Sequence, residues 1–291
     1  MNFAGLQTFL KIVHTGSLVR ASEVLNVTQS TVTARLKGLE NELGQVLLHR
    51  QKSGAELTAA GFKFNRYAEL MNDLWRMAKL ETSQPANIEA VLNFGCDVDL
   101  WPGLGQRIFD EIYGGRPTIG LSIWPGAQVE LDRWLGAGLI DVALTFQPFA
   151  HENQTIYDLG QERLVLVTTR SGSPMRFDPQ YVYVHSGEDF AQKHSAAFAD
   201  ADTAKINFAC AVWALEHLME HGGSAYLPER LVKLHILAGR LFHVSDAPIF
   251  ARNIYLVTNN VTAVNWPELP ELAKRLVGNV AVPTPAFFER P

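Results

Sequence analysis

Residues 17–39 read SLVRASEVLNVTQSTVTARLKGL, and this stretch decides the fold of the amino-terminal region. Ser17 and Thr28 each precede a short run with helical periodicity, and hydroxyl side chains at such positions cap helix N-termini. Asn26 lies between the two runs, where its short amide tolerates the left-handed conformation that ends a helix. Two short helices joined by a tight turn cross steeply, which is the geometry of a helix-turn-helix.

The third helix, which begins after Thr28, has two distinct faces. Its apolar residues are expected to form a buried stripe, and they are Val32, Leu36, Leu39 and Leu43. The opposite face is small, polar and basic. It comprises Ser30, Thr33, Ala34 and Lys37, with Gln29 and Arg35 at its flanks. Small side chains allow a helix to enter a major groove, where Gln pairs with adenine and Arg with guanine. A solvated face without a partner is the alternative.

The flanking segments complete the region. An amphipathic helix with Phe3, Leu6, Phe9, Leu10 and Val13 on one face precedes the pair and ends at Gly16. After the pair, segments 46–49 and 55–58 flank a basic tip that contains Arg50 and Lys52. This pattern predicts a hairpin, or wing, whose basic tip contacts backbone phosphates.

Residues 1–62 taken together resemble the LysR-type transcriptional regulators. The residues that carry the resemblance are Phe9, Ser17, Arg20, Ala21, Glu23, Leu25, 27–33, Leu36, Leu39, Glu40, Leu43, Gly44, Leu47, Leu48, Arg50, Leu57, Thr58, Ala60 and Gly61. The resemblance implies that Gln29, Ser30, Thr33 and Arg35 are groove readers and that Arg20, Arg50 and Lys52 contact phosphates. Helical spacing adds Lys37 to the DNA-binding candidates. Relatives often have a basic or polar residue at the position of Ala34, so one contact fewer is expected here.

A long helix is predicted from residue 59, because no proline occurs before Pro85 and apolar residues recur every three or four positions. The predicted seam is Phe64, Tyr67, Met71, Leu74 and Ala78. In LysR-type proteins, the resemblance implies, this helix pairs with its twin in a homodimer or homotetramer. The alternative is packing against its own domain. Residues 82–87 are interpreted as a hinge.

Charge is distributed unevenly along the chain, whose net charge is −5. Residues 1–87 carry 10 basic and 7 acidic residues, and the remainder carries 15 and 23. A mildly basic head on an acidic body fits a DNA-binding protein. The sequence also lacks a membrane-length apolar run and a secretory signal, so a cytoplasmic protein with reduced cysteines is expected, without a membrane partner.

The body, residues 88–291, alternates apolar runs with amphipathic stretches. Runs at 88–94, 119–124 and 139–146 enclose two helical stretches, which predicts a β-α-β-α-β unit with a parallel sheet. Further strands are predicted at 164–169, 181–184, 206–210, 225–227, 241–244 and 254–257, with a final helix at 269–277. The predicted fold class is therefore α/β: a winged helix-turn-helix (1–58), a linker helix and hinge (59–87), and two Rossmann-like lobes of an effector-binding domain (88–160 with 265–291, and 161–264).

Ligands of parallel sheets bind beyond the carboxyl ends of the strands. The candidate effector residues are therefore Cys96, Asp97, Trp124, Pro125, Phe146, Gln147, His185 and Ser186, although each could be an ordinary loop or packing residue. Many LysR-type relatives have Ser or Thr after the first strand, whereas Asp97 and Asp99 would repel an anion. We expect an effector other than a simple carboxylate held there, with an aromatic or apolar body against Trp124 and Phe146.

Two other motifs compete with this interpretation. His217, Glu220 and His221 match an H-x-x-E-H zinc pattern, but Gly222 ends the helix immediately. Cys96 and Cys210 could form a peroxide switch, but they lie on different predicted strands. Phosphate loops and nucleophile elbows are absent from the sequence, so neither an enzyme nor a cofactor is expected.

The function predicted is a sequence-specific DNA-binding transcriptional regulator whose binding to double-stranded DNA is modulated by an unknown small-molecule effector between the lobes. The alternatives are a constitutive regulator without a ligand, and a solute-binding or catalytic α/β protein with an incidental head.

Overall fold

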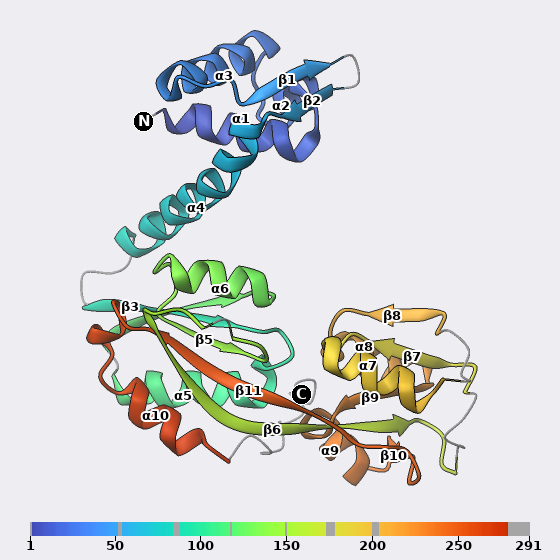
Figure 1. Cartoon of the computed structure of the whole chain (residues 1–291). Helices are drawn as coiled ribbons and strands as arrows, with labels where there is room; N and C mark the ends of the chain where they lie inside the picture. Colours follow the sequence, from blue (N-terminus) through green and yellow to red (C-terminus); the bar gives the residue numbers. More distant parts are fainter. Residues whose placement is uncertain are drawn as a thin grey trace. The chain divides into compact units, whose positions relative to one another are not determined.

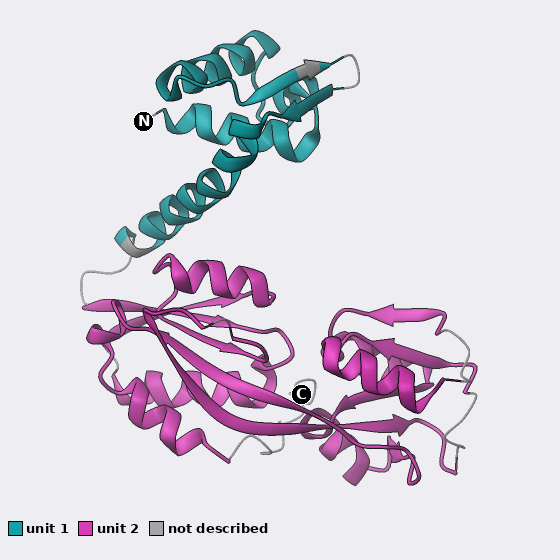
Figure 2. Cartoon of the chain, in the orientation of Figure 1, with its two compact units in different colours: residues 1–85 teal, residues 86–291 magenta. Residues whose placement is uncertain are grey.

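Three helices and a hairpin begin the chain, as the helix-turn-helix prediction requires (Figure 1). They are α1 (Phe3–Thr15), α2 (Leu18–Val24), α3 (Gln29–Leu43), β1 (Leu48–Gln51) and β2 (Gly54–Leu57). This computed structural model describes residues 2–51, 54–83, 88–116, 118–148, 150–172, 178–199 and 204–278. The chain divides into two compact units, residues 1–85 and 86–291 (Figure 2).

The ends of the first helices carry the predicted caps. The hydroxyl groups of Ser17 and Thr28 each accept a hydrogen bond from the backbone N–H of the third residue of the following helix. Asn26 has a φ of 52° and is the one non-glycine residue of the described chain with positive φ. These local interactions stop and restart the chain at the turn, so α2 and α3 form as separate helices.

The core of the head contains most of the predicted apolar stripe. Val32, Leu36 and Leu39 are buried against α1, together with Phe9. The prediction for Leu43 is wrong, because this side chain is 41% exposed. It is the last residue of α3 before the left-handed Gly44, where the helix passes beyond the core.

The linker helix α4 (Ala59–Thr82) is joined to the wing by close backbone contact. The Thr58 hydroxyl donates to the Val46 carbonyl at 2.7 Å and accepts from the Gly61 N–H at 2.9 Å, so it caps α4. A Cβ atom added at Gly61 would lie only 2.0 Å from the Leu47 carbonyl oxygen. Only glycine permits this approach, which explains why Gly61 follows Leu57 and Thr58 at this spacing.

The structure divides the predicted dimerisation seam into two sets. Phe64 and Met71 pack against the core of their own head, with the Phe64 ring 5.4 Å from the ring of Phe9. Tyr67, Leu74 and Ala78 are exposed. The first set therefore packs within its own domain, as the alternative states, and pairing of the second set with another chain stays a prediction.

The body contains a nine-stranded mixed sheet in the order β4-β3-β5-β11-β6-β9-β7-β8, with β10 beside β6. Its strands are β3 (Ala90–Cys96), β4 (Ile119–Pro125), β5 (Val142–Thr145), β6 (Gln154–Thr168), β7 (Tyr181–Val184), β8 (Ile206–Phe208), β9 (Ser224–Pro228), β10 (Phe242–His243) and β11 (Phe250–Asn259). Strands β3, β4 and β5 are parallel, which confirms the predicted β-α-β-α-β unit.

Helices cover both faces of each lobe (Figure 1). They are α5 (Gln106–Gly115), α6 (Gln128–Gly136) and α10 (Leu269–Leu276) in the first lobe, and α7 (Glu188–Ala197), α8 (Ala211–His221) and α9 (Glu229–Leu237) in the second. The residues of α10 complete the first core, as predicted for the final helix. Every described helix is too short or too polar to cross a bilayer.

Two long antiparallel strands, β6 and β11, run through both lobes (Figure 1). Their pairing was not predicted. The predicted lobe boundary at residue 160 falls inside β6, where the β6–β11 register shifts at residues 254 and 255 of the partner strand. The lobes are thus joined through a continuous sheet rather than through loops.

We predict that Gly61→Ala destabilises the head by about 1–3 kcal/mol, because the added methyl group must displace the Leu47 backbone. Gly38→Ala is the matched control: it lies inside α3, and its added Cβ would meet only the flexible end of Asn2 at 3.3 Å. Thermal unfolding of the two variants checks this. Equal stability of the two variants would contradict the explanation.

Candidate nucleic-acid interface and effector site

The outward face of α3 has the composition predicted for a groove reader. Gln29, Ser30, Ala34 and Lys37 are exposed, while Thr33 and Arg35 are partly buried. The Ser30 hydroxyl lies 2.8 Å from the Thr28 hydroxyl, so it also supports the cap. The face combines hydrogen-bonding groups with a cationic end, as base readout requires.

The structure describes the side chain of only one of the three predicted phosphate contacts. Arg20 is exposed in the first turn of α2, where its backbone N–H donates to the Ser17 cap. Arg50 lies on β1, but its side chain lies outside the description, and Lys52 lies outside the described residues altogether. The hairpin itself is present, with Leu48 paired to Leu57. The wing is thus confirmed as a backbone element, and its phosphate contacts stay a prediction.

The carboxyl ends of β3, β4 and β5 meet at one edge of the sheet, as the parallel pattern predicts. The Asp97 N–H donates to the Leu144 carbonyl at 3.0 Å, and the Gly126 N–H donates to the Cys96 carbonyl at 3.2 Å. Cys96 is buried and Pro125 is exposed. This edge therefore brings Cys96, Asp97 and Pro125 together.

The loop after β5 reaches the loop after β7. A Cβ atom placed on Gly187 would lie 3.5 Å from the Gln147 amide nitrogen, so the first lobe meets the second here. His185 is exposed, and the neighbouring Ser186 is only 5% exposed. Its hydroxyl has no hydrogen-bond partner within the described chain. Gln147, His185 and Ser186 thus lie at one junction between the lobes.

Two predicted aromatic contacts are used within the protein. Trp124 packs edge-on against Trp134 of α6 and donates to the Asn93 side chain at 3.3 Å. The guanidinium carbon of Arg252 lies over the Phe146 ring, 3.5 Å from the centre of that ring. Trp124 therefore supports the α6 face of the sheet, and Phe146 positions a cation.

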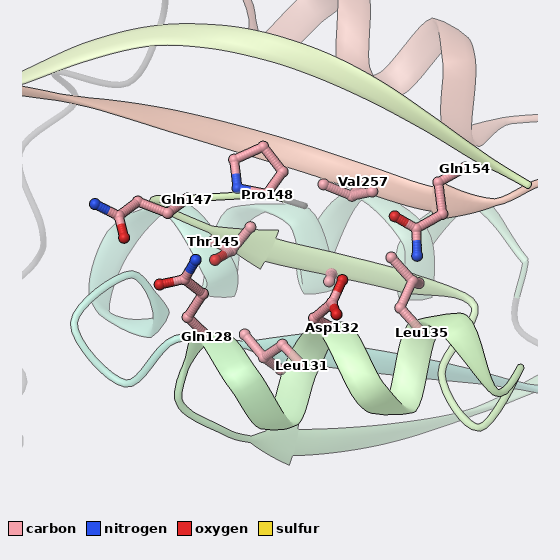
Figure 3. Close-up of a pocket in the computed structure, with 10 residues that line it drawn as sticks. Gln128, Leu131, Asp132, Leu135, Thr145, Gln147, Pro148, Gln154 and Val257 are labelled. Carbon is pink, nitrogen blue, oxygen red and sulfur yellow. The ribbon is translucent and has the colours of Figure 1, made fainter. Parts of the chain in front are cut away.

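A pocket borders the same edge, between α6 and strands β5 and β11 (Figure 3). Gln147 and Thr145 lie at one end of it and Gln154 at the other, with leucines of α6 between them. Asp132 of this pocket lies 2.9 Å from the His151 imidazole. Gln147 consequently borders both the pocket and the second lobe.

A buried charge network, missed at the sequence level, links the lobes. Glu162 of β6 accepts from the Arg230 Nε at 2.7 Å and from the Arg252 Nε at 2.5 Å. Arg230 also donates to the carbonyl groups of Pro102 (2.8 Å) and Asp99. The two arginines hold the pKa of Glu162 below its usual value although burial opposes this. Glu162, Arg230 and Arg252 are far apart in the sequence, so no local pattern predicted the network.

Asp97 and Asp99 have different environments. The Asp97 carboxylate accepts from the Asp99 N–H at 2.9 Å, and burial together with the Asp99 charge raises the pKa of Asp97 to about 6. Asp99 is 3% exposed and accepts from two backbone amides of α8. Burial raises its pKa too, opposed by the Arg252 charge and those amides. Asp99 is therefore a structural carboxylate rather than a free repulsive charge.

Comparisons with known proteins agree with this geometry. The model of the bacterial regulatory helix-turn-helix protein, lysR family, matches residues 3–62. The HTH-type transcriptional regulator HdfR of Yersinia enterocolitica is 27% identical over 263 residues, covering 87% of this chain and 88% of the relative, and HdfR of Yersinia pestis is 28% identical over 264 residues with the same coverage. Residues 3–62 are therefore similar to the lysR family of helix-turn-helix proteins, and the chain is similar to HTH-type transcriptional regulators over most of its length.

Solved LysR-type structures share the fold over the whole chain. CbnR in complex with its target DNA matches with a TM-score of 0.63 and 21% identity, covering 96% of this chain and all of that one. DarR of Vibrio fischeri in complex with DNA has a TM-score of 0.55 and 16% identity, covering 97% and 98%. LysG of Corynebacterium glutamicum with bound effector Arg has a TM-score of 0.53 and 20% identity, with the same coverage.

The residues of the two competing motifs lie within the described ranges. No three His, Cys, Asp or Glu side chains converge as a metal site within the described ranges. Cys96 and Cys210 are free and buried, and burial raises the pKa of both thiols, which disfavours the reactive thiolate. The relatives are transcription regulators rather than enzymes.

We predict that Asp97→Asn stabilises the protein increasingly as pH rises. Because the folded pKa of Asp97 is about 6 and the unfolded value is 3.8, the folded carboxyl group binds its proton more tightly, and its contribution to stability is lost as pH rises through 6. The advantage of the Asn variant over the wild type should grow by about 2 kcal/mol between about pH 4.5 and pH 7.5. Urea unfolding at both pH values measures it, and a pH-independent difference would contradict the shifted pKa.

Proposed function

We propose that this LysR-type regulator reads DNA as a dimer or tetramer through α3 and the wing, and that a small-molecule effector between the lobes modulates the binding. The single observation that carries the DNA-reading role is the outward face of α3. Thr28 caps the start of this helix, and its buried stripe packs against the core of the head. Gln29, Ser30, Thr33 and Arg35 supply base contacts in this proposal, and Arg20, Lys37, Arg50 and Lys52 supply phosphate contacts.

The effector role is supported by the junction of the lobes. Asp97, Gln147, His185 and Ser186 offer polar groups there, and the buried Ser186 hydroxyl lacks a partner within the described chain. Cys96, Trp124, Pro125 and Phe146 shape the surrounding edge in this proposal. A ligand that prefers one arrangement of the lobes would supply the coupling energy. LysG, a LysR-type protein of the same fold, is described with a bound effector. We place the protein in the cytoplasm, where a DNA-binding regulator acts.

The DNA-reading role predicts that Gln29→Ala with Arg35→Ala lowers specific affinity by about a hundredfold, since each base contact contributes about 1–3 kcal/mol. The titration uses a duplex selected by the wild-type protein from a random pool, and a scrambled duplex reports background binding. Background affinity should change little. The control is Lys79→Ala, an exposed change far along α4. Equal affinity of the double variant and the wild type for the selected duplex would overturn the proposal.

The dimer predicts that Leu74→Glu separates the subunits, because a carboxylate would enter an apolar seam formed with Tyr67 and Ala78. Sedimentation velocity should show monomers, and specific DNA affinity should fall by about tenfold or more as one half-site is lost. Lys79→Glu alters charge on the same helix away from the seam and should leave the assembly intact. A dimeric Leu74→Glu protein would place the interface elsewhere.

A further inference from the structure

Asp99 occupies the start of helix α8 from the other lobe. Its Oδ1 accepts from the Ala211 N–H at 2.7 Å and from the Val212 N–H at 3.2 Å, which are the first two residues of α8. Cys210, the residue that precedes the helix, makes no capping bond with its side chain. The N-cap of α8 is therefore supplied by a carboxylate more than a hundred residues earlier in the chain.

The cations around this carboxylate are also engaged. The Asp99 Oδ2 lies 3.7 Å from the Arg252 Nη2, and the Asp99 carbonyl accepts from Arg230. Both arginines bind Glu162. Asp97, Asp99 and Glu162 thus face two arginines, which leaves an excess of one negative charge. An exposed helix N-terminus beside arginines would bind an anion, but here the chain's own carboxylate fills that position.

We propose that Asp99 is a specificity-determining residue that fills the anion site at the start of α8, holds the lobes together without a ligand, and excludes anionic effectors from that point. This inference rests on the proposed effector role of the junction and specifies its chemistry. A carboxylate or phosphate of an effector would have to displace a buried group of the same charge to reach this point, so anionic groups are expected to bind elsewhere.

The test vacates the site and refills it with a small anion. Asp99→Ala should lower the Tm of the full chain by about 5 °C, through loss of the cap and of the Arg252 pair. Sodium formate should restore more than half of this loss, relative to sodium chloride at equal ionic strength, because formate fits the space of the missing carboxylate. Any general salt effect of formate, acetate or phosphate on the Tm of the wild type should be matched by the same effect on Asp99→Asn.

Three measurements keep the result decisive. Amide hydrogen exchange should be faster at Ala211 and Val212 in Asp99→Ala and slow again with formate. Asp99→Asn should accept the same amide bonds without charge and gain nothing from formate. Asp110→Ala, the loss of an exposed carboxylate in the same lobe, should show neither the destabilisation nor the rescue.

Unchanged Tm and amide protection in Asp99→Ala would overturn the proposal, as would equal stabilisation of the wild type and the variant by formate. If the Ala variant does not fold, the wild-type anion series and the Asn variant still decide, since a small anion that stabilises the wild type more than Asp99→Asn contradicts an occupied site. The Tm and amide-exchange measurements are made without DNA. A negative result therefore contradicts the role of Asp99 and leaves the proposed DNA binding unaffected.

Discussion

The Glu162 carboxylate, shared by the buried Arg230 and the largely buried Arg252, is the interaction on which the arrangement of the body depends. Removing three charged groups from water is costly, and only mutual pairing with additional hydrogen bonds compensates for it. Arg230 meets that condition by binding Glu162 together with carbonyl groups of the first lobe, and Arg252 by binding Glu162 and stacking on Phe146. Loss of one member would leave buried charge without compensation, so the lobes are joined by a polar network as well as by the sheet.

Local chemistry explains why the head was predictable. A cap, a left-handed residue and a helical stripe each depend on neighbours within a few positions, so Ser17, Asn26 and Thr28 could be interpreted from spacing alone. The errors arise where that logic ends. Leu43 fits the stripe but lies beyond the core, and Phe64 fits a coiled-coil seam but packs against Phe9 of its own head. Periodicity identifies an apolar face and does not identify what covers it.

The body was predictable in outline and not in its connections. Alternating apolar runs indicated parallel strands, whereas the pairing of β6 with β11 joins segments about ninety residues apart, which no local pattern encodes. The candidate effector residues show the same limit. Strand order placed Asp97, Gln147 and Ser186 near one another, but it could not distinguish Trp124, which packs on α6, from a residue facing the junction. It also could not show that Asp99 caps a helix of the other lobe.

The contact between Gly61 and the Leu47 carbonyl has a mechanical consequence. The linker helix is anchored to the head at more than one point, through the close approach of Gly61 to the Leu47 carbonyl and through Phe64 and Met71 in the core. A few degrees of rotation applied at the far end of α4 would then sweep the recognition helix through a proportionate arc instead of being absorbed at the joint. In the proposed dimer, two α4 helices paired along their exposed residues would fix the distance between the two α3 helices. The contact at Gly61 would then help to determine which spacing of DNA turns the dimer fits.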